Sequence, residues 1–214
     1  MMKYNDNQIE NLRFEVGKRL SEKRFVHTLG VEKMAVLIGE KTIPEAISEL
    51  RVAALLHDIS KEYSEAEQTF IMKKHNIELG EGEVCEPALW HSITAPKVIE
   101  NDFPEYASEA VLSSAYNHTV GSPNMSIFDE IVLLSDYIEE GRKYDKCVSL
   151  RAEFLSEFEK ADSADAMIIS LHKAVAKSLD NNIQEFISRG RSYHQRTELT
   201  RDAIYSKIER QNNG

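Results

Sequence analysis

The sequence predicts an all-α protein, a helical bundle folded as a single domain over residues 1–214. Apolar residues recur at steps of three and four through most of the chain, which is typical of helices with one buried face. No run shows the period-two alternation of a half-buried strand, and no Asn-Gly or Asp-Gly pair joins two such runs. The length suits one full hydrophobic core, which we expect within about residues 20–190.

Two amphipathic helices are predicted first, over residues 9–23 and 28–39, where apolar side chains fall on one face. The pattern Thr42-x-x-Glu45 then has the form of a capping box, in which each side chain bonds the other residue's backbone N–H. Pro44 suits the first turn of a helix because its missing N–H would have no helical partner there. These signals predict a third helix that runs to about residue 59.

A second capping box, Ser64-x-x-Glu67, predicts the next helix, which runs to about His75. Residues 76–86 are expected to form a loop because they contain two glycines and several acidic residues. A short helix is predicted to start at Pro87. Further helices are predicted at residues 105–117, 128–143, 149–160 and 163–188. The polar residues 189–214 are expected to form a surface helix or a partly frayed tail.

The composition argues against nucleic acid and membranes as partners. The net charge is −10 and the pI about 5.3, whereas broad nucleic-acid binding requires a basic face. No segment is long and apolar enough to cross a bilayer, and the N-terminus has no apolar signal core. Cys85 and Cys147 fall in no metal or redox spacing, so we expect free thiols in a cytoplasmic protein.

Residues 51–63 carry two stripes at helical spacing. The apolar stripe contains Val52, Leu55, Leu56 and Ile59. The second stripe, which is offset by two residues and turned nearly away from the first, contains Ala54, His57, Asp58 and Lys61. A buried carboxylate is strongly unfavourable without a partner, and a metal ion bound between His57 and Asp58 would remove that cost. Taken alone, the pair is better explained as a half-solvated His-Asp at a helix end, because single motif matches are often false positives.

Four further residues stand beside apolar stripes that would direct them inward: His27, His91, His118 and Asp136. Each alone could be an ordinary hydrogen-bonded side chain. Together with His57 and Asp58 they give four histidines and two aspartates from five predicted helices. Such a mixed set of imidazole and carboxylate ligands suits iron, manganese, cobalt or zinc.

These motifs resemble the HD-domain superfamily and, within it, the YqeK-type bis(5′-nucleosyl)-tetraphosphatases (symmetrical), which share an all-helical HD-domain fold. The resemblance covers nearly the whole chain. Its most specific combination is His57-Asp58-x-x-Lys61, His118-Thr119-x-Gly121 and Asp136-Tyr-Ile-Glu-x-x-Arg142. The resemblance implies a metal-dependent phosphohydrolase that cleaves a small nucleotide, diadenosine tetraphosphate, to two ADP through a water activated by two metals.

The resemblance also implies a role for each residue of the set. One metal would be held by His27, His57, Asp58 and Asp136, and a second by His91 and His118 with Asp58 bridging. The family points to iron, while the ligand types leave manganese, cobalt and zinc open.

Three more residues are candidates for binding substrate phosphate: Lys61, Thr119 and Arg142. Lys61 lies one turn beyond His57, and Arg142 lies six residues after Asp136, where we expect the end of the same helix. A guanidinium can bind phosphate in two places. Asp58, Lys61 and Arg142 are therefore the predicted catalytic residues, although a solvated helix face would also explain the two cations.

Four positions depart from the family pattern: Ser92, Thr94, Ser135 and Glu140. None is a proposed metal ligand, so they leave open only which nucleotide is preferred. Of the remaining histidines, His75 and His172 are expected on helix surfaces, and His194 is a weak candidate for supporting the site.

Two other functions remain open from the sequence. One is a different reaction of the same family, on a deoxynucleotide or a cyclic nucleotide. The other is a non-catalytic module that senses nucleotide or metal. The sequence also leaves the native metal and the choice between monomer and homodimer open.

Overall fold

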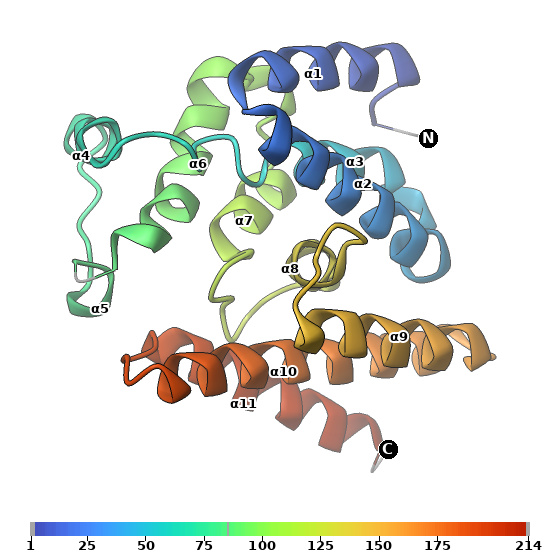
Figure 1. Ribbon diagram of the computed structural model, residues 1–214. Coiled ribbons are helices and arrows are strands. Elements are labelled where there is room, and N and C mark those ends of the chain that lie inside the picture. Colours follow the sequence, from blue (N-terminus) through green and yellow to red (C-terminus); the bar gives the residue numbers. More distant parts are fainter. Residues whose placement is uncertain (1–2, 85, 213–214) are drawn as a thin grey trace.

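The computed structural model describes residues 3–84 and 86–212, and within these ranges all regular structure is helical (Figure 1). In chain order the α-helices are α1 (Asp6–Arg19), α2 (Glu22–Thr42), α3 (Ile47–Leu56), α4 (Glu65–Lys74), α5 (Glu81–Val84), α6 (Trp90–Asp102), α7 (Glu109–Asn117), α8 (Ile127–Ile138), α9 (Asp145–Lys160), α10 (Ala164–Ser188) and α11 (Gln195–Asn212). Single turns of 3-10 helix, η1 (Pro44–Ala46), η2 (Pro87–Leu89) and η3 (Pro104–Tyr106), precede α3, α6 and α7. The predicted all-α class is confirmed.

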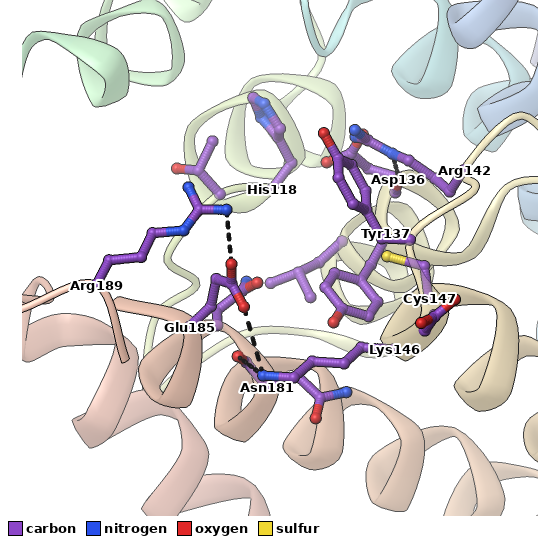
Figure 2. Close-up of a pocket in the computed structure, with 14 residues that line it drawn as sticks. His118, Asp136, Tyr137, Arg142, Lys146, Cys147, Asn181, Glu185 and Arg189 are labelled. Atoms are coloured by element: carbon purple, nitrogen blue, oxygen red, sulfur yellow. Dashed lines mark hydrogen bonds and ion pairs between the residues drawn. The ribbon is translucent and has the colours of Figure 1, made fainter. Parts of the chain in front are cut away.

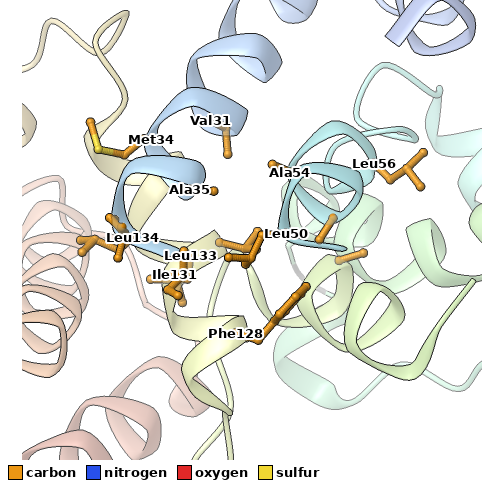
Figure 3. Close-up of a cluster of buried hydrophobic side chains, with 14 of the residues drawn as sticks. Val31, Met34, Ala35, Leu50, Ala54, Leu56, Phe128, Ile131, Leu133 and Leu134 are labelled. Atoms are coloured by element: carbon orange, nitrogen blue, oxygen red, sulfur yellow. The ribbon is translucent and has the colours of Figure 1, made fainter. Parts of the chain in front are cut away.

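Helix α8 is the central element of the bundle. It runs between α1–α3 on one side of the molecule and α9–α11 on the other (Figure 1). Every residue from Phe128 to Ser135 is buried, which explains the long apolar run in this part of the sequence. Figure 3 shows Ile131 and Leu134 of α8 packed with Met34 and other side chains of α2. This packing fixes the position of α8 relative to the helices that carry the histidines.

Local sequence signals account for most helix starts. Ser64 and Glu67 form the predicted capping box of α4, and Ser126 with Asp129 forms another at α8. Thr42 and Glu45 do not form one. The Thr42 hydroxyl instead donates to the Ile38 carbonyl within α2, and α3 begins at Ile47 without a side-chain cap.

Several helix boundaries differ from the predictions. The predicted helix 9–23 ends at Arg19, and α2 begins at Glu22 rather than at residue 28. Helix α3 ends at Leu56 rather than near residue 59, and His57 begins a series of hydrogen-bonded turns. Helix α8 ends at Ile138 rather than 143, because Glu139 adopts an extended backbone with ψ 155°. The predicted loop 76–86 contains the short helix α5.

The C-terminal segment forms helix α11, which packs along α10. Although the segment is polar, it buries Ile204 and Ile208. Lys207 reaches from α11 to the fully buried Glu130 of α8, with 2.7 Å between Nζ and Oε1. The other oxygen of Glu130 lies 2.6 Å from Nδ1 of His172. The prediction that His172 is a surface residue is therefore wrong, since it is 3% exposed and completes a buried polar cluster.

No helix in the described ranges has both the length and the apolar character needed to span a bilayer. Cys147 is buried as a free thiol, and Cys85 lies outside the described residues.

Candidate metal and phosphate site

The six side chains predicted as metal ligands lie together although they come from five different parts of the bundle. His27 is in the second turn of α2, and His57 and Asp58 directly follow α3. The other three are His91 in the first turn of α6, His118 at the C-terminal cap of α7, and Asp136 in the last turn of α8. In this arrangement, Nε2 of His27 lies 2.9 Å from the Asp136 carboxylate, and Nε2 of His91 lies 3.1 Å from Nε2 of His118.

Three of the histidines are held by the same local contact. Nδ1 of each ring lies 2.6–2.8 Å from the carbonyl oxygen of the alanine three residues earlier; the pairs are His57 with Ala54, His91 with Ala88, and His118 with Ala115. A carbonyl oxygen only accepts, so Nδ1 must carry the proton and donate it. In its neutral form, each ring then directs the lone pair of Nε2 into the cluster, as a metal ligand must.

His27 is oriented by a carboxylate instead. Its Nδ1 lies 3.2 Å from Oε1 of Glu139, whose side chain is 4% exposed. The Gly141 backbone N–H also donates to Glu139. Gly30 makes room for this carboxylate, because a Cβ at that position would overlap it. The contact directs Nε2 of His27 toward Asp58 and Asp136.

Asp58 divides the cluster into two halves. Its Oδ2 faces His27 and His57, with Nε2 atoms at 3.9 and 3.5 Å. Its Oδ1 faces His91 and His118, with both Nε2 atoms at 3.3 Å. Each half brings three ligand atoms within 4.8 Å of one another, and Asp58 belongs to both. Each half contains residues that the family resemblance assigns to one metal.

The cluster has the polar imbalance expected of a cation site. Nε2 of His27, Nε2 of His57 and Oδ1 of Asp58 are buried without a hydrogen-bond partner. Several lone pairs and two carboxylates thus converge in a buried space, which is costly unless positive charge joins them. The donor set fits a pair of metal ions that accept imidazole and carboxylate.

The acid–base properties of the cluster point the same way. Burial alone would raise the pKa of Asp58, but the neighbouring imidazoles of His57 and His118 hold it well below its usual range. Burial acts to lower the pKa of His57, but the Asp58 carboxylate acts to raise it, and the net result is a raised pKa. The cluster therefore attracts positive charge, whether a proton or a metal ion supplies it.

Three cations border the cluster. Nζ of Lys61 lies 3.2 Å from Nε2 of His91. Burial lowers the pKa of this ammonium, although the negative charge of Asp58 acts to raise it. Arg142 follows α8 rather than ending it, and its Nη2 lies 2.5 Å from Oδ1 of Asp136. Arg24 was not among the predicted site residues, but its Nη1 lies 2.8 Å from Oδ2 of Asp58.

Thr119 lies beside the cluster, and its hydroxyl donates to Ser92 at 3.1 Å. Ser92 in turn donates to the Leu89 carbonyl. Of the other departures from the family pattern, Thr94 and Ser135 are fully buried in α6 and α8. Glu140 is exposed and pairs with Lys33. Ser92 is thus the departure that contacts a predicted phosphate-binding residue.

A cavity of about 540 Å³ opens from the cluster toward α9 and α10. Its cluster side is formed by His118, Thr119, Asp136 and Arg142 (Figure 2). Asn181, Glu185 and Arg189 of the α10 segment form the opposite side. The volume is within the range of roughly 300–1,000 Å³ that is usual for small-molecule sites.

The remaining histidines lie away from these contacts. His194 lies against α5, with Nε2 4.0 Å from Glu83. His75 caps the C-terminus of α4, and its Nε2 contacts Asn101.

Two residues that contact the cluster had no role in the sequence analysis, Arg24 and Glu139. Arg24 precedes His27 by three residues on a helix, so helical spacing could have found it. Glu139 approaches His27 only because α8 ends at the preceding residue, Ile138. No local signal in the sequence predicts that the helix ends there.

Comparisons with known proteins agree with this arrangement. The symmetrical bis(5′-nucleosyl)-tetraphosphatase of Bacillus subtilis is 27% identical over 131 residues, which are 60% of this chain and 68% of that protein. The protein of the same name from Halalkalibacterium halodurans is 28% identical over 172 residues, 78% of this chain and 85% of that protein.

A solved structure from Clostridium acetobutylicum, described as a predicted HD superfamily hydrolase involved in NAD metabolism, superimposes with a TM-score of 0.77. It is 28% identical, and the match covers 97% of this chain and all of that one. The profile of the HD domain family matches residues 24–173, which include all six clustered residues. The chain belongs to the HD domain family.

Proposed function

We propose that this protein is a metal-dependent phosphohydrolase that cleaves diadenosine tetraphosphate symmetrically to two ADP. The observation that carries the proposal is the placement of Asp58, with one oxygen toward His27 and His57 and the other toward His91 and His118. Two relatives that bear the name symmetrical bis(5′-nucleosyl)-tetraphosphatase support the choice of substrate.

The proposed metal ligands fall into two sets that share Asp58. His27, His57 and Asp136 would complete one set, and His91 with His118 the other. When bound, such a pair of ions lowers the pKa of water toward neutrality and polarises phosphoryl oxygens. Iron is the proposed metal.

The chain's own residues contribute position and charge. The Nδ1 contacts of the histidines hold their rings in one orientation, so little reorganisation is needed during the reaction. Arg24, Lys61 and Arg142 are placed to offset the charge of the phosphoryl oxygens. These local cations support binding of an anionic substrate by a protein whose net charge is −10.

The reaction adds water across the central anhydride bond. Oxygen from water forms a bond to one central phosphorus, the bond from that phosphorus to the bridging oxygen breaks, and the second ADP leaves with the bridging oxygen. Because ADP is already a good leaving group, no strong general acid is required.

The test is a product analysis of metal-loaded protein. Separate preparations with iron, manganese, cobalt or zinc are incubated with diadenosine tetraphosphate, cyclic nucleotides and deoxynucleoside monophosphates. We expect ADP as the sole product from the first substrate. AMP with ATP would contradict symmetric cleavage, and turnover of the other substrates alone would indicate another reaction of the family. Absence of all turnover with two metals bound would favour a sensing module.

A further inference from the structure

We infer that the part of the cavity beyond Arg142 is a nucleoside subsite in which the base stacks on Tyr144. This inference rests on the proposed function, because it takes ADP as the ligand. It places the phosphates of ADP at the cluster end of the cavity and the nucleoside at the other end. Tyr144 and Arg142 both line this space of about 540 Å³, so one ligand can contact both.

The two ends of the cavity differ in charge. The cluster end carries Arg142 in its lining, with Lys61 and Arg24 bordering the same cluster. The carboxylates that pair with Arg24 and Arg142 are Asp58 and Asp136, both proposed metal ligands, so bound metal ions would leave this end with an excess of positive charge. Phosphate groups would therefore be directed to this end.

At the other end the charged side chains neutralise one another. Lys146 and Arg189 both pair with Glu185, at 3.6 and 2.6 Å (Figure 2), and Asp145 supplies the second carboxylate of this wall. This part of the lining thus holds two cations and two carboxylates, which leaves no net charge to hold a phosphate. The formal balance fits an uncharged group such as a nucleoside.

Tyr144 provides the surface on which a base can stack. It occupies the N-cap position of α9 but makes no side-chain capping bond, so its ring has no role in starting that helix. The residue is 72% exposed and lines the cavity. A flat base laid on this ring would cover apolar surface that is otherwise in contact with water.

Amide groups complete the neutral wall. Asn181 and Asn182 of α10 line the same cavity and are partly buried. A carboxamide offers both a donor and an acceptor, as the edge of a nucleobase requires. These amides and Tyr144 line one cavity, so a single nucleoside can contact both.

The test separates the nucleoside from the phosphates by comparing ADP with pyrophosphate. Binding of each is measured by titration calorimetry on the metal-loaded full chain. We expect Tyr144→Ala to weaken ADP binding about tenfold, as for loss of one aromatic stack, and to leave pyrophosphate binding unchanged. Tyr144→Phe, which keeps the ring, should bind ADP as the unmodified protein does.

Phe14→Ala is the matched control, because Phe14 is 65% exposed on α1 and lies outside the cavity lining. The inference is overturned if Tyr144→Ala binds ADP normally, if it loses ADP and pyrophosphate equally, or if the unmodified protein does not prefer ADP. These results do not depend on turnover. Failure to hydrolyse diadenosine tetraphosphate would count against the proposed function alone.

Discussion

At the scale of single residues, the site is organised by which ring nitrogen of each histidine carries a proton. An alanine carbonyl fixes this choice for His57, His91 and His118, and Glu139 fixes it for His27. The six side chains that cluster could be selected from the sequence because they stand in motifs. The contacts that orient them could not, since Glu139 meets His27 across 112 residues.

Glu139→Gln should weaken metal binding by about 10- to 100-fold, the usual effect of losing a carboxylate that orients a ligand histidine. The amide can still face His27 but no longer stabilises its Nδ1–H with a negative charge. Metal titration of the purified protein measures the change. Glu140→Gln is the control, because Glu140 is exposed and pairs only at the surface. Equal affinities in the two variants would refute the role given to Glu139.

Arg24→Gln should weaken pyrophosphate binding to the metal-loaded protein by about tenfold, which corresponds to loss of one charge-assisted contact. The reason is that Arg24 borders the cluster from α2. Calorimetry measures this change, with the adjacent exposed Lys23→Gln as control. If Arg24→Gln and Lys23→Gln bind pyrophosphate alike, Arg24 is a structural partner of Asp58 only.

At the scale of helices, the sequence indicates their order and centres better than their ends. Amphipathic spacing and capping residues predict α4 well. The ends of α3 and α8 were misplaced because tertiary contacts determine them. Just after α8, the Glu139 carboxylate accepts hydrogen bonds from the Gly141 backbone N–H and from Nδ1 of His27. These contacts favour an extended backbone at Glu139 over another helical turn. These two early helix ends position His57, Asp58 and Arg142.

Helix α11 is tied to the core by a buried ion pair. Lys207→Met removes the cation that contacts Glu130, a residue with no exposed surface. We expect the free energy of unfolding to fall by about 2 kcal/mol, because a buried carboxylate loses one of its partners.

Urea unfolding followed by circular dichroism measures this change. Lys177→Met, which breaks an exposed pair with Glu153, should change the free energy of unfolding by less than about 1 kcal/mol. Comparable losses in both variants would show that Glu130 does not depend on Lys207.

At the scale of the whole molecule, the bundle places ligands that are far apart in sequence around one point. The all-α class follows from periodicity, and HD family membership follows from the motifs. The cavity wall contributed by α9 and α10 could not be predicted, because its residues carry no motif and meet the cluster only through packing on α8.

The metal content of the protein tests the central claim most directly. Elemental analysis of protein loaded with iron and then desalted should find two ions per chain, and Asp58→Asn should retain fewer than one because both proposed sets share Asp58. Asp136→Asn, which alters only one set, should keep about one ion. An unmodified protein that binds no ion or one, or an Asp58→Asn variant that keeps both, would contradict the account.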